Sequence, residues 1–208
     1  MTGVQTCALP ISLLAHAGTT LQPAEPARAA LVLVAVQEEY RNGRLPLVGV
    51  DAALDEICRL LHRMRRLEVP VIHLRHLGRP GGGLFDPGGT GALIIPAAGP
   101  RDGEIVIDKS LPDGFTGTDL AARLRAEGRD QPVFAGFMSH LCISSTARAA
   151  LHLGFAPTVV GRASATRDLP AAAGETEPVP AEILHRATLA ALADRFAAVV
   201  PDAGAWGG

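Results

Sequence analysis

The stretch FAGFMSHLCISSTARAALHLGF, residues 134–155, contains the two kinds of element on which the fold depends. Its first residues form an apolar run of strand length that passes through Gly136, and a helical pattern follows from about His140. Cys142 stands where the strand gives way to the helix. A strand that leads directly into a helix predicts one β–α unit of an α/β domain.

The rest of the chain repeats this alternation. Apolar runs predict strands, and apolar residues at helical spacing predict the helices between them. The expected strands are 30–36, 70–74, 104–108, 132–136, 156–161 and 196–200, and the expected helices are 50–67, 118–127, 140–153 and 180–193. Strands that alternate with helices favour a parallel sheet covered on both faces, that is, a doubly wound, three-layer α/β/α fold.

The N-terminal part of the chain lacks this pattern. Residues 1–11, MTGVQTCALPI, resemble the conceptual translation of a common sequencing adapter. The segment from there to about residue 29 carries two prolines and no sustained period, which predicts a loose lead-in. We therefore expect residues 1–29 to lie outside the fold and residues 30–208 to form a single domain.

Composition limits the classes of partner. The chain has 208 residues, of which 48% are hydrophobic, and a formal net charge of −2, so it offers no electrostatic case for binding nucleic acid or an anionic membrane. No apolar run reaches the ~20 residues of a spanning helix. Three scattered cysteines are too few for a disulfide framework, which predicts a reducing, cytoplasmic location. We expect a small-molecule partner.

The basic residues single out one position. Of the 19 lysine and arginine residues, 18 are arginine and the only lysine is Lys109, at the end of an expected strand. Lysine shifts its pKa readily, whereas arginine keeps its proton in proteins. Lys109 is therefore either a surface lysine left by chance or a group whose proton the protein uses.

Cys142 allows two interpretations of its own. In the first turn of a helix, a thiol lies beside free backbone N–H groups and the positive end of the macrodipole, which lowers its pKa and favours the thiolate. The same N–H groups can hold an oxyanion. Alternatively, Cys142 is a small residue that fills space between helix and sheet. Cys58 lies on the apolar face of its expected helix and is interpreted as a packing residue.

The sequence resembles the isochorismatase-like cysteine hydrolases from about residue 30 to residue 200. The cysteine motif of that family, roughly C-V-x-S-T-A-R-x-A-x-x-L-G, and its K…F…G-T-D-L and A-T segments have counterparts here. The matching residues are Cys142, Ser145, Thr146, Ala147, Arg148, Ala150, Leu153, Gly154, then Lys109, Phe115, Gly117, Thr118, Asp119, Leu120, and finally Ala165 and Thr166.

The resemblance implies a six-stranded parallel sheet and a triad of aspartate, lysine and cysteine that cleaves a C–N bond through a thioester. It places Cys142 as the nucleophile with Lys109 beside it. It also implies a cis peptide bond between Phe137 and Met138, with the N–H groups of Met138 and Cys142 facing the oxyanion. It implies no cofactor, and a homo-oligomer, either a dimer or a tetramer.

The first strand departs from the family pattern. Its usual ending, V-I-D-M-Q-x-x-F/Y, is replaced by VAVQEEY, so Ala35 occupies the position of the catalytic aspartate. Glu38 would point to the opposite face if the strand continued, and Glu39 would lie ~13 Å further along it, so neither replaces the aspartate. The substrate pocket is expected to include five side chains: Gln37, Tyr40, Arg75, Phe115 and His140.

Histidines offer two further possibilities. His140 either pairs with Cys142, as in other Cys–His sites, or lines the turn and caps the helix. His73 and His76 end the second strand, where nicotinamidase-like relatives bind a metal through an Asp-x-His pattern. VIHLRHLGRP contains no aspartate, so we expect no metal at this position.

The sequence leaves three functions open. The leading hypothesis is a cysteine hydrolase of a small amide, ureide or lactam, impaired by Ala35. The second is a homologue that binds small molecules with weak or no catalysis. The third is vinyl-ether hydrolysis of the isochorismatase type, for which the family uses the aspartate and not the cysteine. Since this chain keeps the cysteine and lacks the aspartate, the third ranks last.

Overall fold

The computed structural model describes residues 10–207 and contains a sheet of six parallel strands. The strands are β1 (Ala29–Val34), β2 (Val71–His76), β3 (Ile105–Lys109), β4 (Gln131–Phe137), β5 (Thr158–Ala165) and β6 (Ala198–Val200). Their spatial order is β3-β2-β1-β4-β5-β6. The order reverses between β1 and β4, as in doubly wound folds, so the predicted fold class is confirmed.

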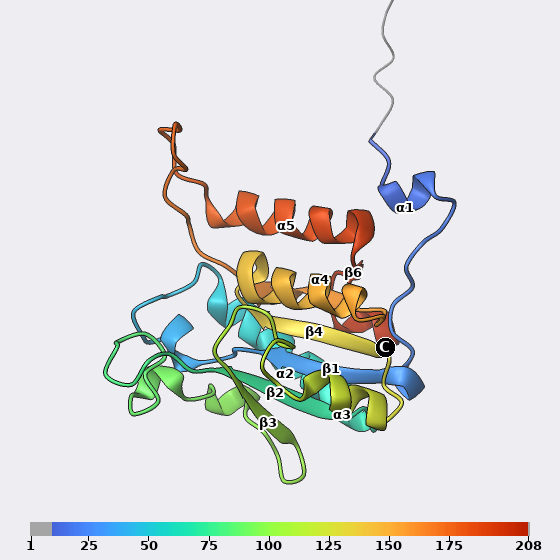
Figure 1. Cartoon of the computed structure of the whole chain (residues 1–208), viewed down its shortest axis with the longest axis horizontal. Coiled ribbons are helices and arrows are strands. Elements are labelled where there is room, and N and C mark those ends of the chain that lie inside the picture. The colour runs from blue at the N-terminus through green and yellow to red at the C-terminus, as the bar shows by residue number, and fades with distance from the viewer. Residues whose placement is uncertain (1–9, 208) are drawn as a thin grey trace, which may run out of the picture.

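The helices cover both faces of this sheet. They are α1 (Leu13–His16), α2 (Val50–Arg66), α3 (Leu120–Ala126), α4 (Ser144–His152) and α5 (Ala181–Arg195). Right-handed crossovers place α2, which connects β1 to β2, on one face, and α3 and α4, which lead to β4 and β5, on the other. Figure 1 shows α4 beside the sheet and α5 outside it.

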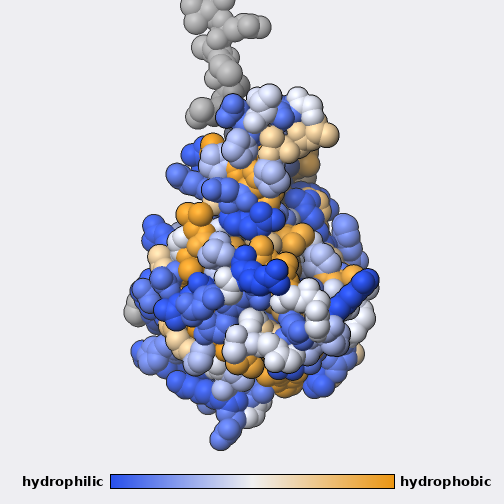
Figure 2. All heavy atoms as spheres, turned by 90° about the vertical axis from the view of Figure 1, so that its left-hand side faces the viewer, coloured by the Kyte–Doolittle hydropathy of each residue, from blue (hydrophilic) through white to orange (hydrophobic). Residues whose placement is uncertain are grey.

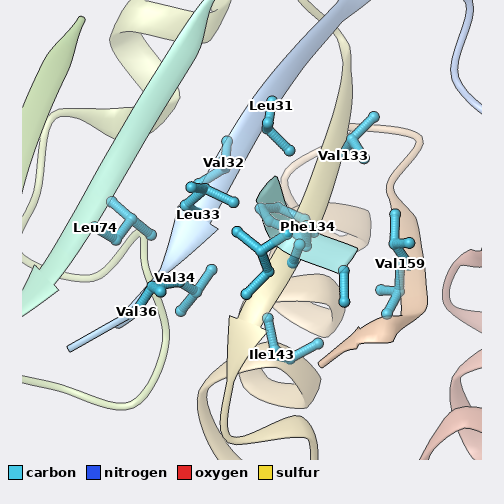
Figure 3. Packing of buried hydrophobic residues seen from close by; sticks show 14 of the residues in the cluster. Leu31, Val32, Leu33, Val34, Val36, Leu74, Val133, Phe134, Ile143 and Val159 are labelled. Atoms are coloured by element: carbon cyan, nitrogen blue, oxygen red, sulfur yellow. The ribbon is translucent and has the colours of Figure 1, made fainter. Parts of the chain in front are cut away.

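The core lies around the two central strands. Every residue of β1 is buried, as its unbroken apolar sequence predicts for a strand covered on both faces. Figure 3 shows Leu31, Leu33 and Val34 of β1 beside Phe134 of β4, with Ile143 close to the end of β4. Phe134 has no exposed surface. The strands that lead to Ala35 and Cys142 are therefore buried along nearly their whole length.

The lead-in is more structured than its lack of periodicity suggested. Ser12 caps α1 through its hydroxyl, and the Leu13 N–H donates to the Asp194 carboxylate at the end of α5 at 2.8 Å. Further along, the carbonyl of Ala24 accepts from Trp206 Nε1 at 2.7 Å. Contacts with the C-terminal part of the chain hold this segment. Most of the adapter-like stretch, residues 1–9, lies outside the described residues.

Loops gather at the carboxyl edge of the sheet, where parallel α/β sheets form their sites. Figure 1 shows the loops after β1, β2 and β5 projecting on the same side. Figure 2 views the molecule from that side and shows a mostly hydrophilic face with apolar patches between its upper and lower parts. Within residues 10–207, none of the helices combines the length and the apolar character that a membrane span requires.

Candidate active site

The end of β4 is shaped by a glycine. Gly136 has φ +123°, and a Cβ atom built on it would lie 2.1 Å from the carbonyl oxygen of Val34 in β1, so no larger residue fits. The next bond, Phe137–Met138, is a cis peptide at the position that the family resemblance indicated. In residues 10–207 the Met138 N–H donates to no acceptor. The turn therefore offers a free donor at the carboxyl edge.

The helix that follows begins differently from the prediction. Residues Ser139–Ile143 form a π-helical turn, closed by a hydrogen bond of 3.1 Å from the Ile143 N–H to the Met138 carbonyl. The α-helix itself starts at Ser144, not near His140. Cys142 thus lies in the turn before α4. Single π turns recur at functional sites because they shift side chains out of the regular helical register.

Lys109 and Cys142 meet in the interior. The Nζ atom of Lys109 lies 3.5 Å from Sγ of Cys142, and both residues are only 3% exposed. Nζ also donates to the carbonyls of Leu111 at 2.8 Å and of Pro112 at 3.1 Å. The only lysine of the chain is therefore not a surface residue, and it faces the thiol directly.

The position of Ala35 follows from the strand order. Lys109 ends β3 and Cys142 follows β4, so the lysine side chain reaches the thiol across the ends of β2 and β1. Ala35, the first residue beyond β1, is fully buried at this edge. Its φ is +50°, in the left-handed region where aspartate and asparagine are enriched among residues other than glycine.

The pKa values of neighbouring groups reflect this enclosure. Burial lowers the pKa of Lys109, while the facing Cys142 raises it. Burial raises the pKa of Tyr40, and negative charge at Cys142 raises it further. Burial and the positive charge of Lys109 lower the pKa of His76 to about 4, so its imidazole is neutral near pH 7. A neutral imidazole and a neutral phenol therefore accompany the lysine and the thiol.

Tyr40 lies close to the end of β4, whereas Gln37 is not free to bind a substrate. Tyr40 is 2% exposed and its ring packs edge-on against Phe137 with centroids 5.8 Å apart. The Gln37 amide donates to the carbonyls of His76 and Ala92 and accepts from the His76 N–H at 2.7 Å. With its amide used in this way, Gln37 fixes the end of β2.

Two further predicted pocket residues lie elsewhere. Arg75 is the neighbour of His76 in β2 and therefore faces the other side of the sheet, where it pairs with Asp108 at 2.6 Å. Phe115 is 7% exposed, and its ring stacks on Phe155 and meets Phe134 edge-on. Side-chain alternation and core packing, respectively, keep these two residues away from the thiol.

His140 does not pair with the thiol through Nδ1. That atom shares a hydrogen bond with the hydroxyl of Thr166, just beyond β5. Burial and then the charge of Arg167 lower the pKa of His140. Its observed contact fits the interpretation in which it lines the turn.

The two histidines of β2 face opposite sides of the sheet. His73 Nε2 lies 3.0 Å from the Glu104 carboxylate, within a polar cluster on the face away from the site. His76 shares the face of Lys109, its partner in the strand register. In the described part of the chain no group of three or more histidine, cysteine or acidic side chains gathers in a way that could hold a metal ion.

Sequence reasoning missed two neighbours of the lysine. His76 was considered only as a metal ligand, yet its Nδ1 is buried without a hydrogen-bond partner in residues 10–207. Asp113, four residues after Lys109, is a carboxylate that senses the charge of the lysine. Burial would raise the pKa of Asp113, but N–H bonds from Thr116 and Phe115 and the lysine charge lower it. The only sequence signal was proximity to Lys109.

Comparisons with known proteins agree with this architecture. A curated relative, the uncharacterized isochorismatase family protein YddQ of Bacillus subtilis, is 36% identical over 82% of this chain and 94% of its own length. The crystal structure of an isochorismatase from Pseudomonas putida KT2440 superposes with a TM-score of 0.87 at 40% identity, covering 93% of this chain and 97% of the other.

Several relatives carry the names of amidohydrolases or related hydrolases. A streptothricin hydrolase of Streptomyces noursei is 37% identical over 85% of this chain and 63% of its own length. A ureidoacrylate amidohydrolase of Stutzerimonas stutzeri and a maleamate amidohydrolase of Pseudomonas putida are 27% and 30% identical over shorter regions. The model of the isochorismatase domain matches residues 29–203. With this match across nearly the whole fold, the chain belongs to the isochorismatase family.

Proposed function

We propose that this protein is a cysteine hydrolase that cleaves a C–N bond of a small amide, ureide or lactam through a thioester on Cys142. The observation that carries the proposal is the 3.5 Å contact between the Cys142 thiol and the Lys109 amine at the carboxyl edge of the sheet. A buried positive charge at that distance favours the thiolate, which is the nucleophilic form of cysteine. Named amidohydrolases and a streptothricin hydrolase among the relatives point to the same bond class.

The turn before α4 supplies the second requirement of acyl transfer. When the thiolate attacks a carbonyl carbon, negative charge develops on the carbonyl oxygen and needs fixed donors. The free N–H of Met138, together with the N–H of Cys142, is proposed to hold that oxygen. Collapse of the intermediate releases the amine, and water then hydrolyses the thioester. We also retain the sequence predictions of a cytoplasmic protein and a homo-oligomer.

Intact-mass measurement tests this function directly. The protein is incubated with streptothricin, ureidoacrylate and maleamate, the substrates named for the relatives. We expect a transient mass increase from an acyl group on Cys142, located by peptide mapping, together with release of the product. Cys142→Ala removes the nucleophile and should show neither adduct nor product.

Ala35 gives specific support to a second candidate, a binding protein with little turnover. Ala35 stands where the family resemblance implies the carboxylate that transfers protons. An adduct on Cys142 that persists for hours without product release would favour this candidate. Absence of adduct and product, both here and in Ala35→Asp, would contradict the hydrolase proposal for these compounds.

A further inference from the structure

The site has a nucleophile but no free carboxylate in contact with it. Ala35 cannot move a proton, and the acidic residues nearby make other contacts. Glu38 accepts from an asparagine side chain, Glu39 from the N–H of residue 44, and Asp113 from two N–H groups of its own loop. No salt bridge joins Lys109 to a carboxylate within residues 10–207. The proton of the Cys142 thiol therefore needs another acceptor.

The hydrogen bonds of Lys109 orient its nitrogen for that task. An amine nitrogen has four tetrahedral directions, one of which is its bond to the side chain. Two of the other three are directed to the carbonyls of Leu111 and Pro112 at 2.8 and 3.1 Å. The remaining contact is Sγ of Cys142 at 3.5 Å. If the amine is neutral, its two N–H groups bond both carbonyls and its lone pair faces the sulfur.

The residue type at this position fits proton exchange. Arginine supplies every other basic side chain of the chain, 18 in number, and a guanidinium does not give up its proton in proteins. Burial disfavours the charged ammonium and moves the pKa of Lys109 downward, toward the range in which an amine exchanges protons. A positive charge alone could have been provided by arginine.

We infer that Cys142 and Lys109 form a two-residue catalytic dyad in which Lys109 Nζ performs the proton transfers assigned to the missing aspartate. The inference rests on the proposed hydrolase function. In acylation, the thiol proton moves to Nζ and the thiolate forms the S–C bond. The C–N bond then breaks as Nζ returns this proton to the leaving nitrogen. In the second half, water adds to the thioester and gives a proton to Nζ, and the C–S bond breaks to release the acid and the thiolate.

Lys109→Arg separates charge from proton transfer. Arginine keeps the positive charge beside the sulfur, so alkylation of Cys142 by iodoacetamide near pH 7 should stay within about threefold of wild type, since iodide leaves without a proton. Amide hydrolysis needs a proton on the leaving nitrogen and should fall by at least ~10²-fold. Thermal melting followed by circular dichroism checks that the variant is folded.

In the Ala35→Asp background, the loss of amide hydrolysis caused by Lys109→Arg should shrink to about tenfold or less, because the carboxylate supplies a second proton path.

Lys109→Met removes both charge and proton acceptor, and its alkylation near pH 7 should fall by at least about tenfold. Unchanged alkylation in this variant overturns the dyad without requiring any amide substrate. Amide hydrolysis by Lys109→Arg within about threefold of wild type overturns it as well, while leaving the hydrolase function intact. If the thiol reacts with iodoacetamide as expected but no amide is cleaved even by Ala35→Asp, the hydrolase function itself is wrong, and with it the catalytic dyad.

Discussion

The two faces of the β2–β3 pair carry contrasting ionisable groups. On one face, the Glu104 carboxylate bonds the Arg65 guanidinium at 2.7 and 2.8 Å and lies 3.0 Å from His73. On the other face, Lys109 has two backbone carbonyls and the thiol of Cys142 as its partners. The first cluster pairs opposite charges, whereas the second leaves a buried amine facing an ionisable sulfur.

This difference indicates that one face stabilises the fold and that the other can take part in catalysis. A half-buried carboxylate that is paired with an arginine and hydrogen-bonded to a histidine is stabilised in its charged form and has no reason to exchange a proton. A buried lysine without a carboxylate can share its proton with the group that it faces, which is the property a nucleophilic site needs. The following experiments add a carboxylate beside Lys109, remove the carboxylate of Glu104 on the other face, or break the Arg75–Asp108 pair.

Ala35→Asp gives the lysine face its carboxylate and should have the largest effect. The backbone at residue 35 already has φ +50°, which aspartate tolerates better than most residues. We expect kcat for amide hydrolysis to rise by roughly 10²-fold, the lower end of what a positioned acid–base group contributes, because Lys109 already moves protons. Ala35→Asn has nearly the same shape without an ionisable group, so an equal rise in both variants would show that proton transfer was not limiting.

Glu104→Gln removes the carboxylate of the opposite face. Burial would raise the pKa of Glu104, but hydrogen bonds from Arg65, the Arg101 N–H and His73 outweigh it and lower the pKa from about 4.5 to about 2. The folded state therefore binds the proton less tightly than the unfolded state. We expect the variant to lose about 2 kcal/mol of unfolding free energy near pH 7, with catalysis unchanged.

The change of stability at low pH tests the same prediction in a second way. Because the pKa of Glu104 is depressed in the folded protein, its contribution is complete above about pH 4.5 and disappears as the pH falls toward 2. Urea unfolding should therefore show wild type and Glu104→Gln converging over that range. Glu127→Gln, at an exposed position, is the matched control. If the stability curves of all three proteins coincide, the Glu104 cluster adds no net stability.

The alternation of strands and helices could be predicted from sequence because it depends on local patterns, although α4 begins at Ser144 and not near His140. The unbroken apolar run at residues 30–36 signals a strand covered on both faces, and Gly136 marks the close approach of two strands. Cys142 and Lys109 were found because strand ends converge at one edge of a parallel sheet. These inferences need only periodicity and topology.

The rest of the site could not be predicted because the strand pattern stops at Ala35. Its left-handed φ ends the alternation of faces, so face assignments for Gln37 and later residues no longer hold. Gln37 instead bonds backbone groups 39 and 55 residues further along the chain, contacts that no local pattern encodes. For Phe115, sequence position beside the lysine motif gave no information on its stacking with Phe155.

Arg75→Ala should have the smallest effect, and it tests whether Arg75 lies on the face of the sheet away from the substrate. Arg75 pairs with Asp108 at 2.6 Å, but the side chains are 34% and 45% exposed, and exposed pairs contribute little. We expect a loss of about 0.5 kcal/mol or less of unfolding free energy and no change in KM for any substrate. Asp108→Asn breaks the same pair from the other side and should match it in stability. A rise in KM confined to Arg75→Ala would place the guanidinium in contact with substrate, as the sequence alone had predicted, and would mean that the separation of the two faces fails at this residue.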